Sequence, residues 1–253
     1  MKQMLINVAQ AEEKRVAIVK NGQLIDFDLE LQNYIQTKGN LYLGKVIRVE
    51  LSLEAVFVDY GAERHGFLPM KNIALELFQK VALSQKSGTN ADMRPKVQDF
   101  IEEGQEFVVQ VEKEERGNKG AALTTYITLA GRYLVFMPNS PRAGGISRRI
   151  DGESRAEMKK LMSSLVIPDD VGVIMRTAGV GRTQEELQWD LDYLVRLWGM
   201  VQKAVKDHKS SRLLFRDSSL MTRTIRDGLR DDIDEVYIDD EVVYQAILIK
   251  MCS

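Results

Sequence analysis

Residues 44–69 read GKVIRVELSLEAVFVDYGAERHGFLP, and this stretch decides the fold of the first half of the chain. It predicts two strands joined by a glycine turn, because residues along a strand alternate between its two faces. That alternation puts Val56 and Val58 on one face. If these valines point into a core, Phe57 between them points outward, and Phe67 follows on the next strand.

Two phenylalanines on a sheet surface beside positive charge suit single-stranded nucleic acid. Every base offers a flat face for stacking, and every linkage carries a negative charge. The alternative, which the pattern leaves open, is that both rings fill the interior of a small barrel. The basic residues nearest in sequence are Lys45, Arg48, Arg64 and His65.

Composition and charge limit the classes of function. The 253 residues allow one large domain or two to three small ones, and a net charge of −2 means that a nucleic-acid surface must be a local patch. The single cysteine, Cys252, and the two histidines, His65 and His208, argue against a disulfide, a zinc site or a histidine-based triad. We find no apolar run that would cross a bilayer and no signal peptide, so we expect no integral membrane segment and a cytoplasmic location.

Short strands dominate up to about residue 119. Asn21-Gly22 joins two strands as a hairpin, and the strands of 41–67 and 106–112 fit a five-stranded OB-type barrel that closes at about Lys119. We expect a short helix over Ala74–Lys80 and a polar surface loop over Ser84–Asp92.

A second part of the chain follows, with a strand-rich patch over Ala121–Met137. Two helices then begin at predicted capping boxes, the first formed by Ser154 and Glu157 and the second by Thr183 and Glu186. The second is the longest helix, with an apolar stripe for packing.

The last forty residues read as an α/β layer with too little sheet to stand alone. We therefore infer that the amino-terminal hairpin completes it, which makes a discontinuous domain with the two termini near one another. Its expected elements are a strand at Leu213–Arg216, a helix at about Leu220–Arg230, a strand at Glu235–Ile238 and a helix at Glu241–Met251.

Arg176 and Thr177 follow the predicted strand Val171–Met175 and precede a glycine-rich turn. Unsatisfied backbone N–H groups at a helix start favour an anion, and arginine adds a forked donor that fits phosphate. The alternative is an ordinary turn whose arginine meets a carboxylate. The loop Arg142–Arg149 is a second basic concentration.

An acidic stretch near the carboxyl end is the one candidate for a two-metal nuclease centre. We favour the interpretation that these carboxylates cap backbone N–H groups and face solvent. They are Asp231, Asp232, Asp234, Asp239, Asp240 and Glu241.

Several motifs resemble the RNase E/G family of bacterial endoribonucleases, and the resemblance runs from Met1 to about Val243. The most specific stretches are Ser52–Ala55, Phe57–Pro69, Lys113–Thr125, Pro141–Arg149 and Arg176–Gly181.

The resemblance implies an α+β protein with an OB-fold β-barrel, an α/β sensor domain for an RNA's 5′-monophosphate, and a split, incomplete RNase H-like subdomain. The implied boundaries are 1–35 and 215–253 for the RNase H-like parts, 36–119 for the barrel and 120–214 for the sensor. Single-stranded RNA is the implied partner, and a homo-oligomer stays open.

The resemblance also implies the roles of individual residues. Phe57, Phe67 and Lys119 match residues that contact RNA on the barrel, and Lys113 joins them as a basic residue along the path of a strand. The implied 5′-phosphate residues are Gly131, Val135, Arg176 and Thr177, with Arg148 nearby.

In the family, catalysis depends on two magnesium-binding aspartates in a subdomain further toward the carboxyl end, and a cysteine-pair zinc link lies beyond it. We expect neither here, and therefore no catalytic residue, metal ligand or cofactor in this chain. The expected function is RNA recognition in RNA processing and mRNA decay, without cleavage. The alternatives are a metal-dependent endoribonuclease that uses the acidic stretch, and a remnant without useful affinity.

Overall fold

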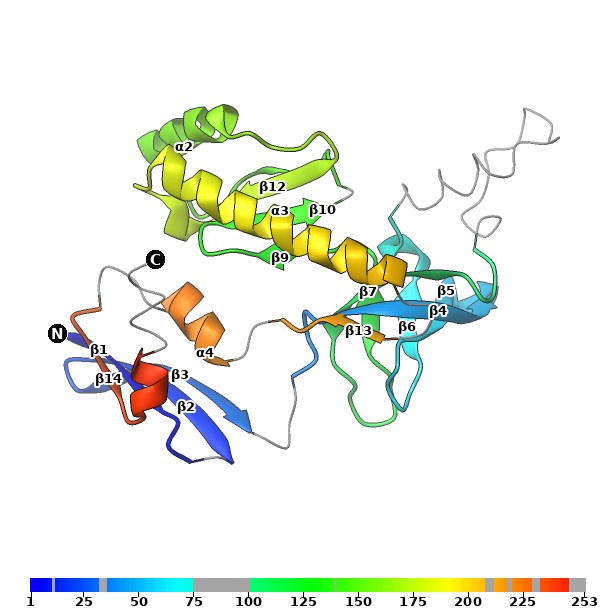
Figure 1. The fold of residues 1–253 in the computed structure, drawn as a ribbon, viewed down its shortest axis with the longest axis horizontal. Helices are drawn as coiled ribbons and strands as arrows, with labels where there is room; N and C mark the ends of the chain where they lie inside the picture. Colours follow the sequence, from blue (N-terminus) through cyan, green and yellow to red (C-terminus); the bar gives the residue numbers. More distant parts are fainter. Residues whose placement is uncertain are drawn as a thin grey trace. The chain divides into compact units, whose positions relative to one another are not determined.

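The computed structural model describes residues 1–10, 12–31, 36–74, 101–138, 140–207, 212–217, 220–228 and 233–245. The chain forms two compact units, one made of Met1–Gln36 with Ser218–Ser253 and the other of Thr37–Asp217 (Figure 1). The helix expected over 74–80 and the loop expected over 84–92 lie outside the described residues, apart from Ala74.

The first unit is a four-stranded sheet built from both ends of the sequence. Asn21 and Gly22 both have positive φ (51° and 81°), so the predicted hairpin turn is confirmed. The strand order is β14-β1-β2-β3, with β14 parallel to β1 and the other pairs antiparallel. The elements are β1 (Lys2–Asn7), β2 (Glu13–Lys20), β3 (Gln23–Leu31), α4 (Leu220–Arg223), the π-helical turn η5 (Thr224–Gly228) and β14 (Glu235–Ile238).

The second unit begins with a closed five-stranded barrel, as predicted. Its strands follow the order β4-β5-β6-β8-β7, and pairing between β4 and β7 closes it. Val56 and Val58 are fully buried in its core, which confirms the face assigned to them. The elements are β4 (Leu41–Glu50), η1 (Leu51–Leu53), β5 (Ala55–Asp59), β6 (Gly66–Pro69), η2 (Met70–Asn72), β7 (Glu106–Lys113) and β8 (Ala122–Thr124).

The predicted end of the barrel at Lys119 is wrong, because the last barrel strand, β8, lies beyond it. Arg116 and Lys119 form an antiparallel bridge around a turn in which Gly117 has φ 58°. That turn sends the chain back along β7, so the next residues pair with β7 and β6 rather than opening a new domain.

A second sheet covered by helices follows within the same unit. The order of its strands is β11-β12-β10-β9, and the apolar stripe of α3 packs on it through Leu187, Leu191 and Leu194, all fully buried. The elements are β9 (Leu129–Ala130), β10 (Leu134–Pro138), β11 (Gly145–Ile146), α2 (Gly152–Ser164), β12 (Val171–Met175), η4 (Thr177–Gly179) and α3 (Gln184–Asp207).

One of the two predicted capping boxes is present. The Thr183 hydroxyl accepts the N–H of Glu186, and the Glu186 carboxylate accepts the N–H of Thr183. The box predicted at Ser154 is wrong, because α2 already begins at Gly152. None of the helices in the described ranges combines the length and apolar character that a membrane crossing requires.

The strand predicted near Leu213 belongs to the second unit rather than to the carboxyl-terminal layer. It is β13 (Arg212–Phe215), and it pairs with the barrel strand β4. Leu214 and Phe215 are half-buried and pack against the core that includes Leu191 and Leu194 of α3, which accounts for the strand's place in this unit.

A buried polar side chain joins the barrel to the second sheet. Gln110 on β7 is 6% exposed and donates hydrogen bonds to the carbonyl oxygens of Gly39 and Thr128 (both 2.9 Å). Its side-chain oxygen accepts the N–H of Thr128 at 2.9 Å. Because a buried amide is costly unless it is fully bonded, these contacts fix the start of the second sheet on the barrel.

Candidate nucleic-acid interface

A row of paired residues crosses five strands on the outer face of the barrel. Phe57 pairs with Phe67, and their ring centroids lie 6.0 Å apart at an interplanar angle of 69°. Arg48 pairs with Phe57 on one side, while Ala122 pairs with Phe67 and then with Lys113 on the other. Because residues opposite each other on neighbouring strands share a face, these five residues form one strip, the aromatic row.

Both rings of the aromatic row lie outside the barrel core. Phe57 and Phe67 are half-buried, whereas their neighbours Val56 and Leu68 are fully buried. The alternative in which the two rings fill the barrel is therefore wrong. The two rings meet edge to face and present an apolar surface between two cationic side chains, Arg48 and Lys113.

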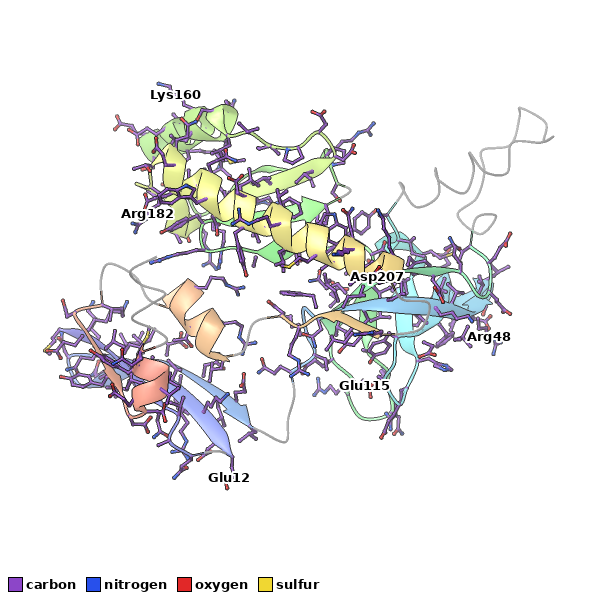
Figure 2. The ribbon with its side chains drawn as sticks, viewed as in Figure 1. Glu12, Arg48, Glu115, Lys160, Arg182 and Asp207 are labelled. Carbon is purple, nitrogen blue, oxygen red and sulfur yellow. The ribbon has the colours of Figure 1, made fainter. Side chains whose placement is uncertain are left out.

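The basic end of the row at Arg48 is held by an acidic neighbour. Its guanidinium lies 2.7 Å from Glu50, which also accepts the hydroxyl of Ser52 at 2.6 Å (Figure 2 shows where Arg48 lies). The Ser52 hydrogen bond, together with the charge of Arg48, holds the pKa of Glu50 below its ordinary value. The carboxylate therefore stays ionised and orients Arg48 along the surface.

The hairpin between β7 and β8 carries the second predicted lysine of the barrel. Lys119 is exposed, and its backbone forms an antiparallel β-bridge with that of Arg116 across the turn. A Cβ on the next residue, Gly120, would lie 2.2 Å from the backbone oxygen of His65, so the hairpin lies against the β5–β6 connection. Arg64, from that connection, donates a hydrogen bond to the hairpin. The structure thus groups these basic residues close to Phe67.

The predicted phosphate residues gather at one end of the second sheet. β12 ends before Arg176 and Thr177, and β11 runs parallel to it and ends just before Arg148. The turn between β9 and β10 brings Gly131 to the same end. These four residues form the sheet-end cluster. Val135 lies one step further in, paired with both Ala130 and Ile174.

Arg176 reaches across this cluster. Its Nη1 donates to the carbonyl oxygen of Gly131 at 2.6 Å, and its backbone N–H donates to that of Tyr133 at 2.8 Å. A short 3-10 turn begins at Thr177, and α3 begins only at Gln184. The glycine-rich turn therefore separates Arg176 from the start of α3, which lies at the capping box predicted at Thr183, so a phosphate here would meet the side chains of Arg176 and Thr177 rather than a helix end.

Asp190 is a positioning residue that sequence reasoning missed. From the second turn of α3 its carboxylate accepts the backbone N–H groups of Arg132 (3.0 Å), Tyr133 (2.9 Å) and Leu134 (2.9 Å). The available signal was an acid placed between Leu187 and Leu191 on the apolar side of a helix, where a carboxylate needs donors. It holds the loop that carries Gly131.

In the acidic stretch near the carboxyl end, the carboxylates accept hydrogen bonds from backbone N–H groups of the first unit. Asp234 accepts the N–H of Lys2 at 2.6 Å, Asp239 that of Val8 at 2.7 Å, and Asp240 that of Val243 at 2.8 Å. Within the described ranges, no three His, Cys, Asp or Glu side chains are grouped to hold a metal ion. The neighbouring acids at 231 and 232 lie outside those ranges.

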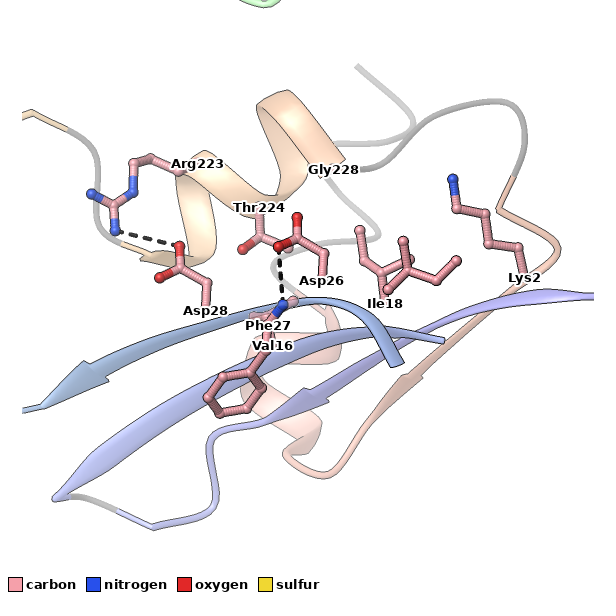
Figure 3. A pocket seen from close by; sticks show the side chains of 10 residues that line it. Lys2, Val16, Ile18, Asp26, Phe27, Asp28, Arg223, Thr224 and Gly228 are labelled. Carbon is pink, nitrogen blue, oxygen red and sulfur yellow. Dashed lines mark hydrogen bonds and ion pairs between the residues drawn. The ribbon is translucent and has the colours of Figure 1, made fainter. Parts of the chain in front are cut away.

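A pocket of about 390 Å³ lies in the first unit between β3 and the α4–η5 segment (Figure 3). Asp26 and Asp28 point into it, while the ring of Phe27 points to the other side of the sheet. Asp28 pairs with Arg223 at 3.8 Å. The pocket is lined by two acidic and two basic side chains, whose charges cancel. None of the predicted RNA residues lines it, so the pocket lacks the positive charge of a phosphate-binding surface.

Two family models match the chain. Residues 35–125 match the S1 RNA binding domain, and residues 128–252 match the Ribonuclease E/G family. The first match covers the barrel, including β8. The second covers the sheet-end cluster and the carboxyl-terminal part of the first unit.

Curated relatives align with almost the whole chain. Ribonuclease E of Haemophilus influenzae (strain ATCC 51907 / DSM 11121 / KW20 / Rd) is 54% identical over 245 residues, and Ribonuclease E of Escherichia coli (strain K12) is 52% identical over 245 residues. Each alignment covers 97% of this chain but only 26% and 22% of those relatives. Ribonuclease G of Escherichia coli (strain K12) is 35% identical over 246 residues, which cover 97% of this chain and 49% of the relative.

Proposed function

Because this chain contains an S1 RNA-binding domain followed by a domain of the Ribonuclease E/G family, we propose that it recognises single-stranded RNA together with its 5′-monophosphate end. The barrel face holds the strand, and the sheet-end cluster holds the terminal phosphate. In this proposal the chain supplies substrate recognition to RNA processing and mRNA decay by an endoribonuclease of this family.

The observation that carries the proposal is the outward-facing pair Phe57 and Phe67. Two bases can stack on these rings while Lys113 and Lys119 contact the backbone phosphates, a combination that binds single strands with little sequence preference. A duplex hides its base faces, so this surface favours unpaired RNA.

The preference for a 5′-monophosphate follows from charge. A terminal phosphate monoester carries about −1.5 to −2 charges, more than an internal diester, and a 5′-hydroxyl carries none. Arg176 offers a guanidinium at the sheet end, Thr177 an exposed hydroxyl, and Arg148 a further exposed cation. The half-buried side chain of Val135 lies beside these residues, and the terminal base can pack against it.

We assign the first unit, Met1–Gln36 with Ser218–Ser253, to the split RNase H-like subdomain that was predicted with parts at 1–35 and 215–253. The parallel pairing of β14 with β1 and the antiparallel hairpin β1–β2–β3 support this assignment. A cytoplasmic location remains the prediction that suits this role.

Binding measurements with matched RNA ends test the proposed function. We expect a 5′-monophosphorylated oligonucleotide to bind more tightly than the same strand with a 5′-hydroxyl, and Arg176→Ala to remove about 1.5–3 kcal/mol of that difference. Arg196→Ala, on the exposed side of α3, is the matched control. Equal affinity for the two ends in the unaltered protein would refute the 5′-end assignment.

We also propose that the acidic stretch does not cleave RNA, since the described acids hold backbone N–H groups. Labelled RNA incubated with the pure chain and magnesium should stay intact. Cleavage that Asp239→Asn abolishes would instead support the metal-dependent nuclease.

A further inference from the structure

A second stripe of side chains runs along α3, on the side opposite to the buried leucines that pack on the sheet. Its members follow one another at alternating steps of four and three residues, which keeps them on one narrow face of the helix. We call this stripe the α3 seam, and its members are Trp189, Tyr193, Arg196, Met200 and Lys203, all of them exposed. Trp189, Tyr193 and Met200 are 67%, 54% and 61% exposed.

The residue types of the α3 seam are those of protein interfaces. Tryptophan, tyrosine, methionine and arginine are enriched in interfaces, whereas the outer side of a surface helix normally carries charged and polar residues. A ring such as that of Trp189 buries about 150–250 Å² when it is covered. Met200 offers a nucleic acid neither a flat face nor a charge, so the composition favours a protein partner.

The spacing of the seam makes it complementary to a second copy of itself. Alternating steps of three and four residues are the contact pattern of paired helices, and a two-fold axis makes each contact occur twice. An axis midway between Tyr193 and Arg196, with the helices antiparallel, sets each of these residues opposite the other, where a guanidinium can lie on a tyrosine ring. The same axis sets Trp189 of one copy opposite Met200 of the other, a favourable contact of sulfur with a ring.

The helix surface beside Met200 leaves room for this contact. A Cβ built on Gly199 would meet nothing within 4 Å, so the surface is open there. The indole ring of Trp189 from the other copy would cover this open place together with Met200. Large and small side chains therefore face each other across the axis.

Charged residues along α3 are arranged so that the same axis pairs opposite signs. Glu185 and Glu186 lie in the first turn of α3, and Lys203 and Lys206 lie near its end. Antiparallel pairing brings Glu185 of one copy close to Lys206 of the other, and Glu186 close to Lys203. The helix dipole accounts for acids at the start and bases at the end, but not for the exposed rings between them.

We propose that the α3 seam is a self-association surface, through which two copies of this chain pair with their α3 helices antiparallel. One helix face on each copy makes an interface at the low end of the size range, below about 1,200 Å² in total, so the dimer is weak and depends on concentration. The inference does not rest on the proposed function, because no residue of the seam belongs to the aromatic row or the sheet-end cluster.

Sedimentation of the full chain over a range of concentrations tests the inference. We expect monomers in dilute solution and a growing fraction of dimers as the concentration rises. Trp189→Ala and Met200→Ala should each weaken the dimer several-fold, and both change exposed side chains, so the fold should persist. Tyr237→Ala, which removes a 52% exposed ring from the first unit, is the matched control and should leave the dimer unchanged.

A charge exchange tests the antiparallel arrangement. Glu185→Lys and Lys206→Glu each place like charges opposite one another twice in the antiparallel pair, so each variant alone should dimerise several-fold more weakly. An equimolar mixture of the two variants restores both opposite-charge pairs and should form a heterodimer as strong as the unaltered dimer. In a parallel pair, each variant alone would instead associate as strongly as the unaltered chain.

A chain that sediments as a monomer at every concentration would overturn the inference. So would a dimer that Trp189→Ala and the charge variants leave unchanged, or one that Tyr237→Ala disrupts, which would place the interface on the first unit. Weaker RNA binding by Trp189→Ala in dilute solution, without any dimer of the unaltered chain, would make the seam a nucleic-acid surface instead. The preference for a 5′-monophosphate, measured in dilute solution, should persist in all the seam variants.

Discussion

Gly131 and Asp190 fit together so closely that a Cβ on residue 131 would lie 2.4 Å from Oδ2 of Asp190. The carboxylate is not free to move aside, because it accepts three backbone N–H groups of the following loop. The contact ties the amino-terminal part of α3 to the turn between β9 and β10. Glycine at 131 is therefore a requirement of close packing.

Breaking this contact should loosen the sheet end. We expect Asp190→Asn to lower the free energy of unfolding by about 1.5–3 kcal/mol, since hydrogen bonds to a charged acceptor are lost. Gly131→Ala should displace the carboxylate and should also lower the free energy of unfolding. Both should weaken the preference for a 5′-monophosphate. Urea unfolding measures the first effect, with Asp192→Asn on the same helix as control. Unchanged stability in both variants would contradict the role of Asp190.

The two rings of the aromatic row should contribute to RNA affinity. Phe57→Ala and Phe67→Ala should each cost about 1–3 kcal/mol of binding free energy, because one stacked base is lost in each. Phe27→Ala, which removes a 51% exposed ring from the first unit, is the matched control and should change little. An unchanged dissociation constant in a folded Phe57→Ala protein would rule out stacking there.

A side chain at residue 120 should damage the barrel. The Cβ of Gly120→Ala would meet the backbone oxygen of His65 at 2.2 Å, so β6 and the β7–β8 hairpin must separate. Gly199→Ala on α3 meets nothing within 4 Å and should instead stabilise the protein by about 1 kcal/mol, the difference in helix propensity. Thermal unfolding of the two variants compares them directly, and a Gly120→Ala protein as stable as the original would show that the strands can move apart without cost.

Stability should fall in alkaline solution through Tyr60. Burial, with the hydrogen bond that its hydroxyl donates to Glu115 at 3.0 Å, raises the pKa of Tyr60 above the ordinary value of 10.0. The folded state therefore favours the neutral phenol. The contribution of Tyr60 to the free energy of unfolding is fully present below about pH 10 and is lost as the pH rises through the higher pKa of the folded state.

Unfolding measured between about pH 8 and pH 11 tests this contribution. Near neutral pH, Tyr60→Phe should have a free energy of unfolding about 1 kcal/mol lower than that of the unaltered protein, because the hydrogen bond is missing. As the pH rises over this range, the variant should lose less stability than the unaltered protein. Tyr126→Phe, which alters a tyrosine that is 40% exposed, should follow the unaltered protein. Parallel curves for all three would contradict the effect.

Local pattern predicted much of the barrel, including the outward direction of Phe57. The alternation around Val56 set the faces of β5, and Asn21-Gly22 set the first hairpin. The capping box at Thr183 marked the start of α3, because its two hydrogen bonds lie within four residues.

Pairing between residues far apart in the chain could not be predicted from local sequence pattern. The barrel end was misplaced because the predicted strand-rich patch at Ala121–Met137 carries no sign that its first strand, β8, pairs with β6 and β7. β13 was assigned to the wrong unit because its four residues carry no sign of their partner, β4. Asp190 was missed because its hydrogen bonds span more than fifty residues, and no local rule connects a helical acid to a distant loop.

Site-directed photo-cross-linking tests the central claim most directly. A 5′-monophosphorylated single strand carries one photoreactive base, either at its first position or at a later one, and the attached peptide is identified by mass spectrometry. We predict that the first base attaches near Val135 and Arg176 and that a later base attaches at Phe57 or Phe67. Attachment of the later bases to the first unit, with none on the aromatic row, would contradict the account.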